Sequence, residues 1–373
     1  MLYASEQTWN GQDKVEKPYQ LAINRMARAM LGAQQSTPRG IIMAESGFTP
    51  ARALLDHRRA RFAQRLYARP QGGQGLEEIL ERRSILTSRL KEAARVERRG
   101  RSAEKQEWDE GRRFGGQIVV EKKEEALRVA KEWNRPDTVW TDGSRQEDGA
   151  VEAACVWRSP GEEGGWTGRR FQLGKNKEVF DAEVFAVWQA LGALEQRNER
   201  DREYTIFVDS TSAITRVRDD ARGPGQRFGV TAIEVETRLA AAGNRVTIRW
   251  VPAHAGAEGN EVADQYARDA ATVRTSREEL LEGYAEETSL AHMTRVATEA
   301  RSKATTDWIT DHVRPGRRYR PPPGKGMRCT KLRRAPKTLA GRYCQLLSGY
   351  AETGTHRHRF GRTDTPACWW CAS

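Results

Sequence analysis

The stretch RWVPAHAGAEGNEVAD (residues 249–264) connects a strand pattern to a helix pattern through a loop rich in glycine and alanine. Apolar and more polar residues alternate over residues 246–250, which predicts a strand. Apolar residues then recur at helical spacing at Val262, Ala263, Tyr266, Ala267 and Ala270. We therefore expect His254 in a strand-to-helix loop and Asp264 in the first turns of the helix.

A purely structural explanation of the same stretch is also available. Gly256 and Gly259 suit a turn, and Asn260 is a residue type that caps helices. Acidic side chains are favoured near a helix N-terminus, because this end of a helix carries a partial positive charge. The stretch alone therefore leaves open whether His254 and Asp264 act chemically or only form a turn and a cap.

The composition favours a polyanionic partner. The chain has 373 residues, enough for two or three compact units. Its 63 Lys and Arg residues exceed its 51 Asp and Glu residues, which gives a net charge of +12. Nucleic acid is the commonest partner of such a surface, although a well-solvated basic surface has the same composition.

No segment predicts a membrane span or a signal peptide. The longest apolar runs are well short of the roughly 20 residues that cross a bilayer. Of five cysteines, Cys155 lies in an apolar segment and the other four lie near the C-terminus, which argues against a secreted disulfide framework. We expect a soluble intracellular protein with no membrane partner, and the sequence does not distinguish nucleus from cytoplasm.

Residues 136–272 carry the pattern of an α/β domain. Five β-prone segments are interleaved with four helical ones, so we expect a mixed five-stranded sheet with helices on both faces. The expected strands are 138–142, 150–157, 165–173, 204–209 and 246–250, and the expected helices are 181–197, 211–219, 226–242 and one that ends near residue 271.

The flanks of this domain have different patterns. Residues 1–110 read as helical, 111–135 as a linker and 275–313 as a helical segment. Residues 314–373 form a basic tail that begins rich in proline and glycine. The fold prediction is thus an α/β domain flanked by helical N-terminal and C-terminal regions.

Three acidic residues stand at unusual places in the α/β pattern. Asp142 and Asp209 each end a β-prone segment, where α/β sheets tend to bind their ligands. Glu183 shares a helix face with apolar residues at i+4, i+7, i+8 and i+11, so its carboxylate is expected to be buried. A buried carboxylate needs a partner, a proton or a metal, whereas a surface acid at a frayed helix start would need none.

If the helices that carry Glu183 and Asp264 pack at the edge where Asp142 and Asp209 emerge, four carboxylates meet. Carboxylates so close together cannot all stay ionised without cations, and an all-oxygen ligand set suits Mg²⁺ or Mn²⁺. Two such ions would activate a water and stabilise the leaving oxygen in phosphodiester hydrolysis.

Four motifs now resemble one family. TDGS (141–144), DAEVFAVWQAL (181–191), VDS (208–210) and WVPAHAGAEGNEVAD (250–264) resemble the ribonuclease H domain in order and in their acidic residues. The resemblance covers about residues 137–272 and implies a ribonuclease H-like fold. It further implies cleavage of the RNA strand of RNA–DNA hybrids.

The resemblance also assigns roles to residues. It implies that Asp142, Glu183, Asp209 and Asp264 bind two Mg²⁺ ions, for which Mn²⁺ can substitute. His254 would then assist proton transfer or product release. One departure concerns residues 179–181: many cellular members carry Asn just before the helix glutamate, where this chain has Val179, Phe180 and Asp181.

Both flanks are similar to parts of non-LTR retrotransposon polyproteins. Residues 21–66 are similar to the helical segment between reverse transcriptase and ribonuclease H, and residues 338–371 to the tail of these polyproteins. No Tyr-x-Asp-Asp polymerase signature occurs in the chain. We therefore expect a ribonuclease H from a polyprotein without its polymerase palm, with the missing reverse transcriptase portion as a second partner.

A zinc site at the C-terminus is the weaker cofactor hypothesis. Cys368 and Cys371 form a Cys-x-x-Cys pair near His356 and His358, as at the start of a zinc knuckle. The sequence ends two residues later, so a complete site would have to recruit Cys344 or a histidine. We expect Mg²⁺ at the four acids and do not expect zinc here.

Two functions from different classes remain open at this point. One is an RNA–DNA hybrid endonuclease, and the other is a catalytically inactive nucleic-acid-binding fragment of a retroelement. The four acids and His254 are all present, which favours the enzyme. A DNA nuclease or integrase on the same fold is disfavoured, because such enzymes have another spacing of acids and lack the His254 loop.

Overall fold

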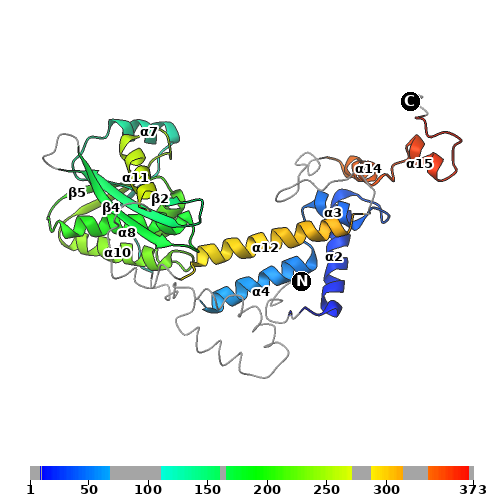
Figure 1. The fold of residues 1–373 in the computed structure, drawn as a ribbon, viewed down its shortest axis with the longest axis horizontal. Helices are drawn as coiled ribbons and strands as arrows, with labels where there is room; N and C mark the ends of the chain where they lie inside the picture. The colour runs from blue at the N-terminus through cyan, green and yellow to red at the C-terminus, as the bar shows by residue number, and fades with distance from the viewer. Residues whose placement is uncertain are drawn as a thin grey trace, which may run out of the picture. The chain divides into compact units, whose positions relative to one another are not determined.

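The computed structural model describes residue 9 and residues 11–67, 111–159, 165–270, 287–313 and 335–368. The chain divides into two compact units (Figure 1). One unit comprises residues 63–83 and 91–295 and contains the α/β domain. The other comprises residues 1–62, 84–90 and 296–373.

A six-stranded sheet forms the centre of the α/β unit, with strand order β1-β6-β5-β2-β3-β4. In this order β1, β6, β5 and β2 run parallel to one another. The strand β3 is antiparallel to β2, and β4 is antiparallel to β3. The strands are β1 (Gln117–Val119), β2 (Thr138–Arg145), β3 (Val151–Arg158), β4 (Trp166–Gly174), β5 (Glu203–Val208) and β6 (Arg245–Trp250).

Helices cover both faces of the sheet. One face packs against α8 (Val179–Gln196), α9 (Thr211–Val217) and α10 (Gln226–Ala241). The other packs against α7 (Lys123–Glu132) and α11 (Glu258–Asp269), through a second core that includes Ala130, Trp140, Val156, Phe207 and Ala263. The helices and the mixed sheet agree with the sequence prediction, except at the first strand.

The sixth strand and its helix correct the prediction of a five-stranded sheet and of a linker over residues 111–135. The strand β1 has only three residues, too few to show an alternating pattern, and it exists because its backbone pairs with β6. The helix α7 buries only Ala126 and Ala130, so its apolar face is short in the sequence. The chain from residue 117 onward is therefore part of the α/β unit.

The second unit is helical in the residues that the structure describes. Its core includes Ile23, Ala27, Leu31, Ile42, Met43, Ala51, Ile309 and Cys344. Its helices are α2 (Asp13–Leu31), α3 (Arg39–Ser46), most of α4 (Ala51–Tyr67) and of α12 (Leu290–Asp311), α14 (Lys337–Ser348) and α15 (Gly354–Arg359). Helix is thus found within the predicted segments 1–110 and 275–313. In the tail expected over 314–373, the described residues 335–368 include the helices α14 and α15. No helix in the described part of the chain is long and apolar enough to span a membrane.

A glycine in the first turn of α11 lets this helix lie directly on Trp140. A Cβ atom at Gly259 would overlap the Trp140 ring, which itself is stacked on Phe207 with ring centroids 4.1 Å apart. We predict that Gly259→Ala lowers the free energy of unfolding by about 1–3 kcal/mol through overpacking. Thermal or urea unfolding of the variant measures this loss.

Gly192→Ala is the matched control, because Gly192 is also helical but a Cβ there would have no neighbour within 4 Å. This substitution is expected to be neutral or to stabilise by up to about 1 kcal/mol. Equal effects at the two glycines would contradict the close packing of α11 on Trp140.

Candidate active site

Three carboxylates from three different elements come together at one edge of the sheet. Asp142 lies in β2, Asp209 follows β5 directly, and Glu183 lies in the second turn of α8. One oxygen of each lies within 4.8 Å of an oxygen of the other two. The parallel pairing of β2 with β5, with Thr141 opposite Val208, brings the two aspartates to the same edge.

Gly143 allows Glu183 to reach this edge. A Cβ atom at Gly143 would lie 2.8 Å from the backbone nitrogen of Glu183 and 2.8 Å from the Cβ of Ala182. Only a glycine therefore lets the start of α8 come so close to β2. Glu183 is 5% exposed, and its Oε2 atom is buried without a hydrogen-bond partner.

The three carboxylates disfavour one another's ionisation. Burial first, and then the charges of Asp209 and Asp264, raise the pKa of Asp142 to about 8. Burial, Asp209 and Asp142 raise the pKa of Glu183 well above its usual value, and burial also raises that of Asp209. Without a bound cation this cluster must therefore hold protons.

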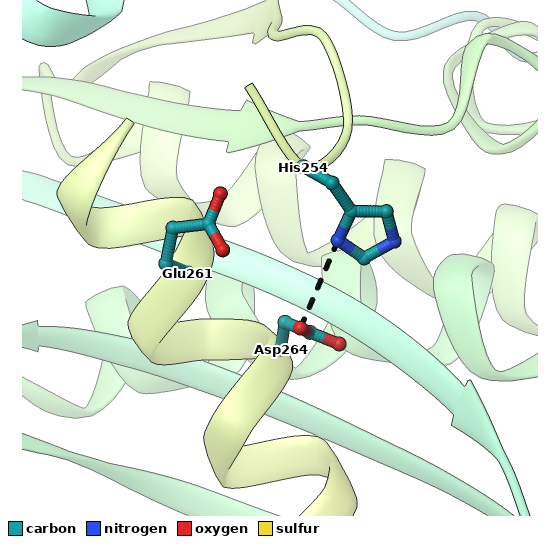
Figure 2. Close-up of side chains that lie close together, drawn as sticks. All are labelled: His254, Glu261 and Asp264. Atoms are coloured by element: carbon teal, nitrogen blue, oxygen red, sulfur yellow. Dashed lines mark ion pairs between the residues drawn. The ribbon is translucent and has the colours of Figure 1, made fainter. Parts of the chain in front are cut away.

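His254, Glu261 and Asp264 form a second group of potential ligands (Figure 2). The Nδ1 atom of His254 lies 3.8 Å from Oδ2 of Asp264, and Glu261 completes a set whose ligand atoms lie within 4.8 Å of one another. Asp264 also pairs with Arg268 at 2.8 Å. The charge of Asp264 raises the pKa of Asp142 and of Asp209, so the two groups are electrostatically one site.

The loop that carries His254 is held to α11 by Glu261. The Gly256 N–H donates a hydrogen bond of 3.1 Å to Oε1 of Glu261. His254 has a left-handed backbone conformation with φ of 48°, and its side chain is 63% exposed. This conformation is uncommon for a residue other than glycine, although histidine is among the residues that adopt it more often. The loop therefore presents an accessible imidazole over the acidic cluster.

Several residues of the site differ from the sequence expectations. Asn260 is not the helix cap, because α11 begins at Glu258 with Ala257 as its N-cap, and Asn260 is buried in the first turn. Glu261 and Arg268 were not predicted as site residues. Their spacing of three and four residues from Asp264 places all three on one helix face, and this was the available signal.

The candidate C-terminal zinc ligands of the weaker hypothesis form no metal-binding group among the described residues. Cys368 is a free, half-buried cysteine, and Cys371 lies outside the described residues. Cys344 is buried in the core of the helical unit. Among residues 335–368, where His356 and His358 are in α15, no group of three metal-binding side chains occurs.

One protein-family model matches the part of the chain that contains this site. A family model for RNase H matches residues 134–272, the part of the chain that carries all four acids and His254. Residues 134–272 have an RNase H-like fold. The match begins after β1 and α7, so these two elements lie outside the residues that match the family model.

Solved structures of RNase H proteins are similar to the chain over about the same share. RNase H1 from the archaeon Halobacterium salinarum is 24% identical, over 36% of this chain and 96% of that one, with a TM-score of 0.28. The PFV RNase H domain is 16% identical, over 37% and 95%, with a TM-score of 0.30. LC11-RNase H1, in complex with RNA/DNA hybrid, is 15% identical, over 36% and 99%, with a TM-score of 0.28. No curated protein matches the chain.

The raised pKa values predict a stability that depends on pH and on metal. Unfolded carboxyl groups have pKa values of about 4, so the protonated cluster contributes its full stability below about pH 4. This stability is lost as the pH rises through the folded-state values toward about 8 for Asp142. We predict that the melting temperature in EDTA falls between about pH 5 and about pH 9, and that Mg²⁺ restores it at the higher pH.

Asp142→Asn isolates this effect from other titrating groups. The variant lacks one of the repelling charges, so its melting temperature in EDTA should fall less over the same pH range and exceed that of the parent protein at the alkaline end. Parallel curves for the two proteins would contradict the coupling among the carboxylates.

Proposed function

We propose that the RNase H domain hydrolyses the RNA strand of RNA–DNA hybrids. The observation that carries this proposal is the convergence of Asp142, Glu183 and Asp209 within 4.8 Å, inside the residues that match the family. RNase H proteins use divalent metal ions, and LC11-RNase H1 has been solved with an RNA/DNA hybrid. The net charge of +12 favours a polyanionic substrate.

The side chains fit a divalent cation. Three carboxylates with raised pKa values, one of which has an orphaned buried oxygen, provide an all-oxygen ligand set for Mg²⁺ or Mn²⁺. Asp142, Glu183, Asp209 and Asp264 would hold two such ions. When bound, these ions supply an activated water and neutralise charge on the transferred phosphate.

The chain's own groups complete the chemistry around the ions. His254, exposed on its loop, would transfer a proton at the leaving oxygen and assist product release. Glu261 positions that loop through the Gly256 N–H, and Arg268 offsets the negative charge of Asp264. Recognition of RNA in the hybrid would use its 2′-hydroxyl groups and phosphates.

We infer that the flanks come from a retroelement polyprotein. This inference rests on the similarity of residues 21–66 and 338–371 to the connector and tail of non-LTR retrotransposon polyproteins. The domain would then act with a reverse transcriptase portion that this chain lacks.

Asp209→Asn tests the activity. We predict that the variant cleaves a labelled RNA–DNA hybrid in Mg²⁺ at least about a hundredfold more slowly, because one of the carboxylates that would hold the metal ions is removed. Binding of the hybrid should be retained, since the basic surface is unchanged. Cleavage is measured on the hybrid, on the RNA alone and on DNA duplex of the same sequence.

Asp311→Asn is the control, since Asp311 is an exposed acid on α12, outside the RNase H domain. It should cleave like the parent protein. Binding of the hybrid without cleavage by the parent protein, in Mg²⁺ and in Mn²⁺, would instead identify a catalytically inactive nucleic-acid-binding fragment. Full cleavage by Asp209→Asn would refute the assignment of the site.

A further inference from the structure

Arginine and tryptophan side chains surround a depression on the sheet face that α7 and α11 cover. The guanidinium carbon of Arg135 lies 5.0 Å from the ring centroid of Trp133, and that of Arg158 lies 5.0 Å from the ring centroid of Trp166. Lys131 and Glu258 line the same depression. Two Arg–Trp pairs from separate parts of the chain therefore share one site.

Hydrogen bonds fix the orientation of these side chains. Glu258 accepts from the Nη2 atom of Arg158 at 2.8 Å and from the Nε1 atom of Trp166 at 3.1 Å. Trp133 donates from Nε1 to Thr138 at 2.8 Å. The rings are half-buried while the arginines are exposed, so flat, charged surfaces face the solvent in a defined orientation.

The depression lies next to the candidate active site. A Cβ atom at Gly256 would lie 3.6 Å from the Nζ atom of Lys131, and Gly256 is two residues beyond His254 in the loop. Lys131 also lines the depression. A strand that leaves the acidic cluster past His254 would meet Lys131 first and then the two Arg–Trp pairs.

We propose that this Arg–Trp depression binds a single strand of nucleic acid that extends from the hybrid. Bases stack on aromatic rings and on guanidinium planes, and Lys and Arg neutralise phosphates, so the site offers both contacts that unpaired nucleotides use. Three cationic side chains stand against one carboxylate, which makes the site electropositive. Ala130, Lys131 and Trp133 lie before residue 134, so the segment that precedes the family match contributes part of this surface.

The proposal rests on the proposed binding of the hybrid by the domain. The test therefore measures binding of the hybrid and binding of the unpaired tail separately. The Asp209→Asn protein, which is expected not to cleave, is titrated with a blunt hybrid and with hybrids that carry an unpaired tail of about ten nucleotides at one strand end, in RNA or in DNA. Fluorescence anisotropy gives the dissociation constants. A tail on at least one end should tighten binding by about fivefold or more.

Arg135→Ala and Arg158→Ala should each remove most of this gain and leave the affinity for the blunt hybrid within about twofold, because both side chains are exposed and lie outside the acidic cluster. Arg158→Lys keeps the charge but lacks the guanidinium plane, so it should lose most of the gain as well. Arg238→Ala is the matched control: Arg238 is exposed and pairs with Glu195, but on α10, which covers the opposite face.

Three results would overturn the proposal. These are no gain from a tail on any strand end, a gain that survives in Arg135→Ala and Arg158→Ala, and an equal loss in Arg238→Ala. Polyglutamate serves as a competitor without bases. If polyglutamate displaced the tail as effectively as a single-stranded oligonucleotide of similar charge does, charge alone would account for binding of the tail. Failure of the blunt hybrid to bind would instead contradict the proposed function, and binding of free single strands would still report on the depression.

Discussion

Three carboxylates repel one another at one edge of the sheet, and the rest of the domain must hold them together against this repulsion. Asp142, Glu183 and Asp209 are brought together by backbone elements that are rigid for other reasons: two paired parallel strands and a helix that is buried throughout residues 181–191. The energy that holds the acids close therefore comes from the core and the sheet. The acids oppose it, and protons or cations must relieve them. Such an arrangement is destabilising by itself, which is typical of a functional site.

The rest of the domain supports this arrangement at short range. Gly143 removes the side chain that would keep α8 away from β2, and Gly259 does the same for α11 against Trp140. Through α11 the domain adds Asp264, and through Glu261 it holds the His254 loop. The acidic cluster and the His254 loop thus depend on two close helix contacts, each made possible by a glycine.

The sequence predicts those strands, helices and site residues that show a clear pattern over a short stretch of chain. Asp142 and Asp209 end clear strand patterns, and Glu183 interrupts an apolar helix face, so their meeting follows once the two strands are taken as neighbours. The strand β1 could not be predicted, because three residues carry no period and its pairing with β6 depends on backbone contacts far apart in sequence. The helix α7 could not be predicted because it buries only Ala126 and Ala130. The Arg–Trp depression depends on residues far apart in sequence. Trp133 and Trp166 are 33 residues apart, and only the fold places them around one depression.

If the carboxylates hold divalent cations, the metal-free protein should bind such ions saturably, and calorimetry measures this binding. Metal-free protein is titrated with Mn²⁺ by calorimetry, beside Glu183→Gln, which removes the charge of one buried acid of the cluster. We expect saturable binding of two ions in the parent protein and a large loss of affinity in the variant. Absence of saturable binding at millimolar Mn²⁺, or equal binding by both proteins, would contradict it.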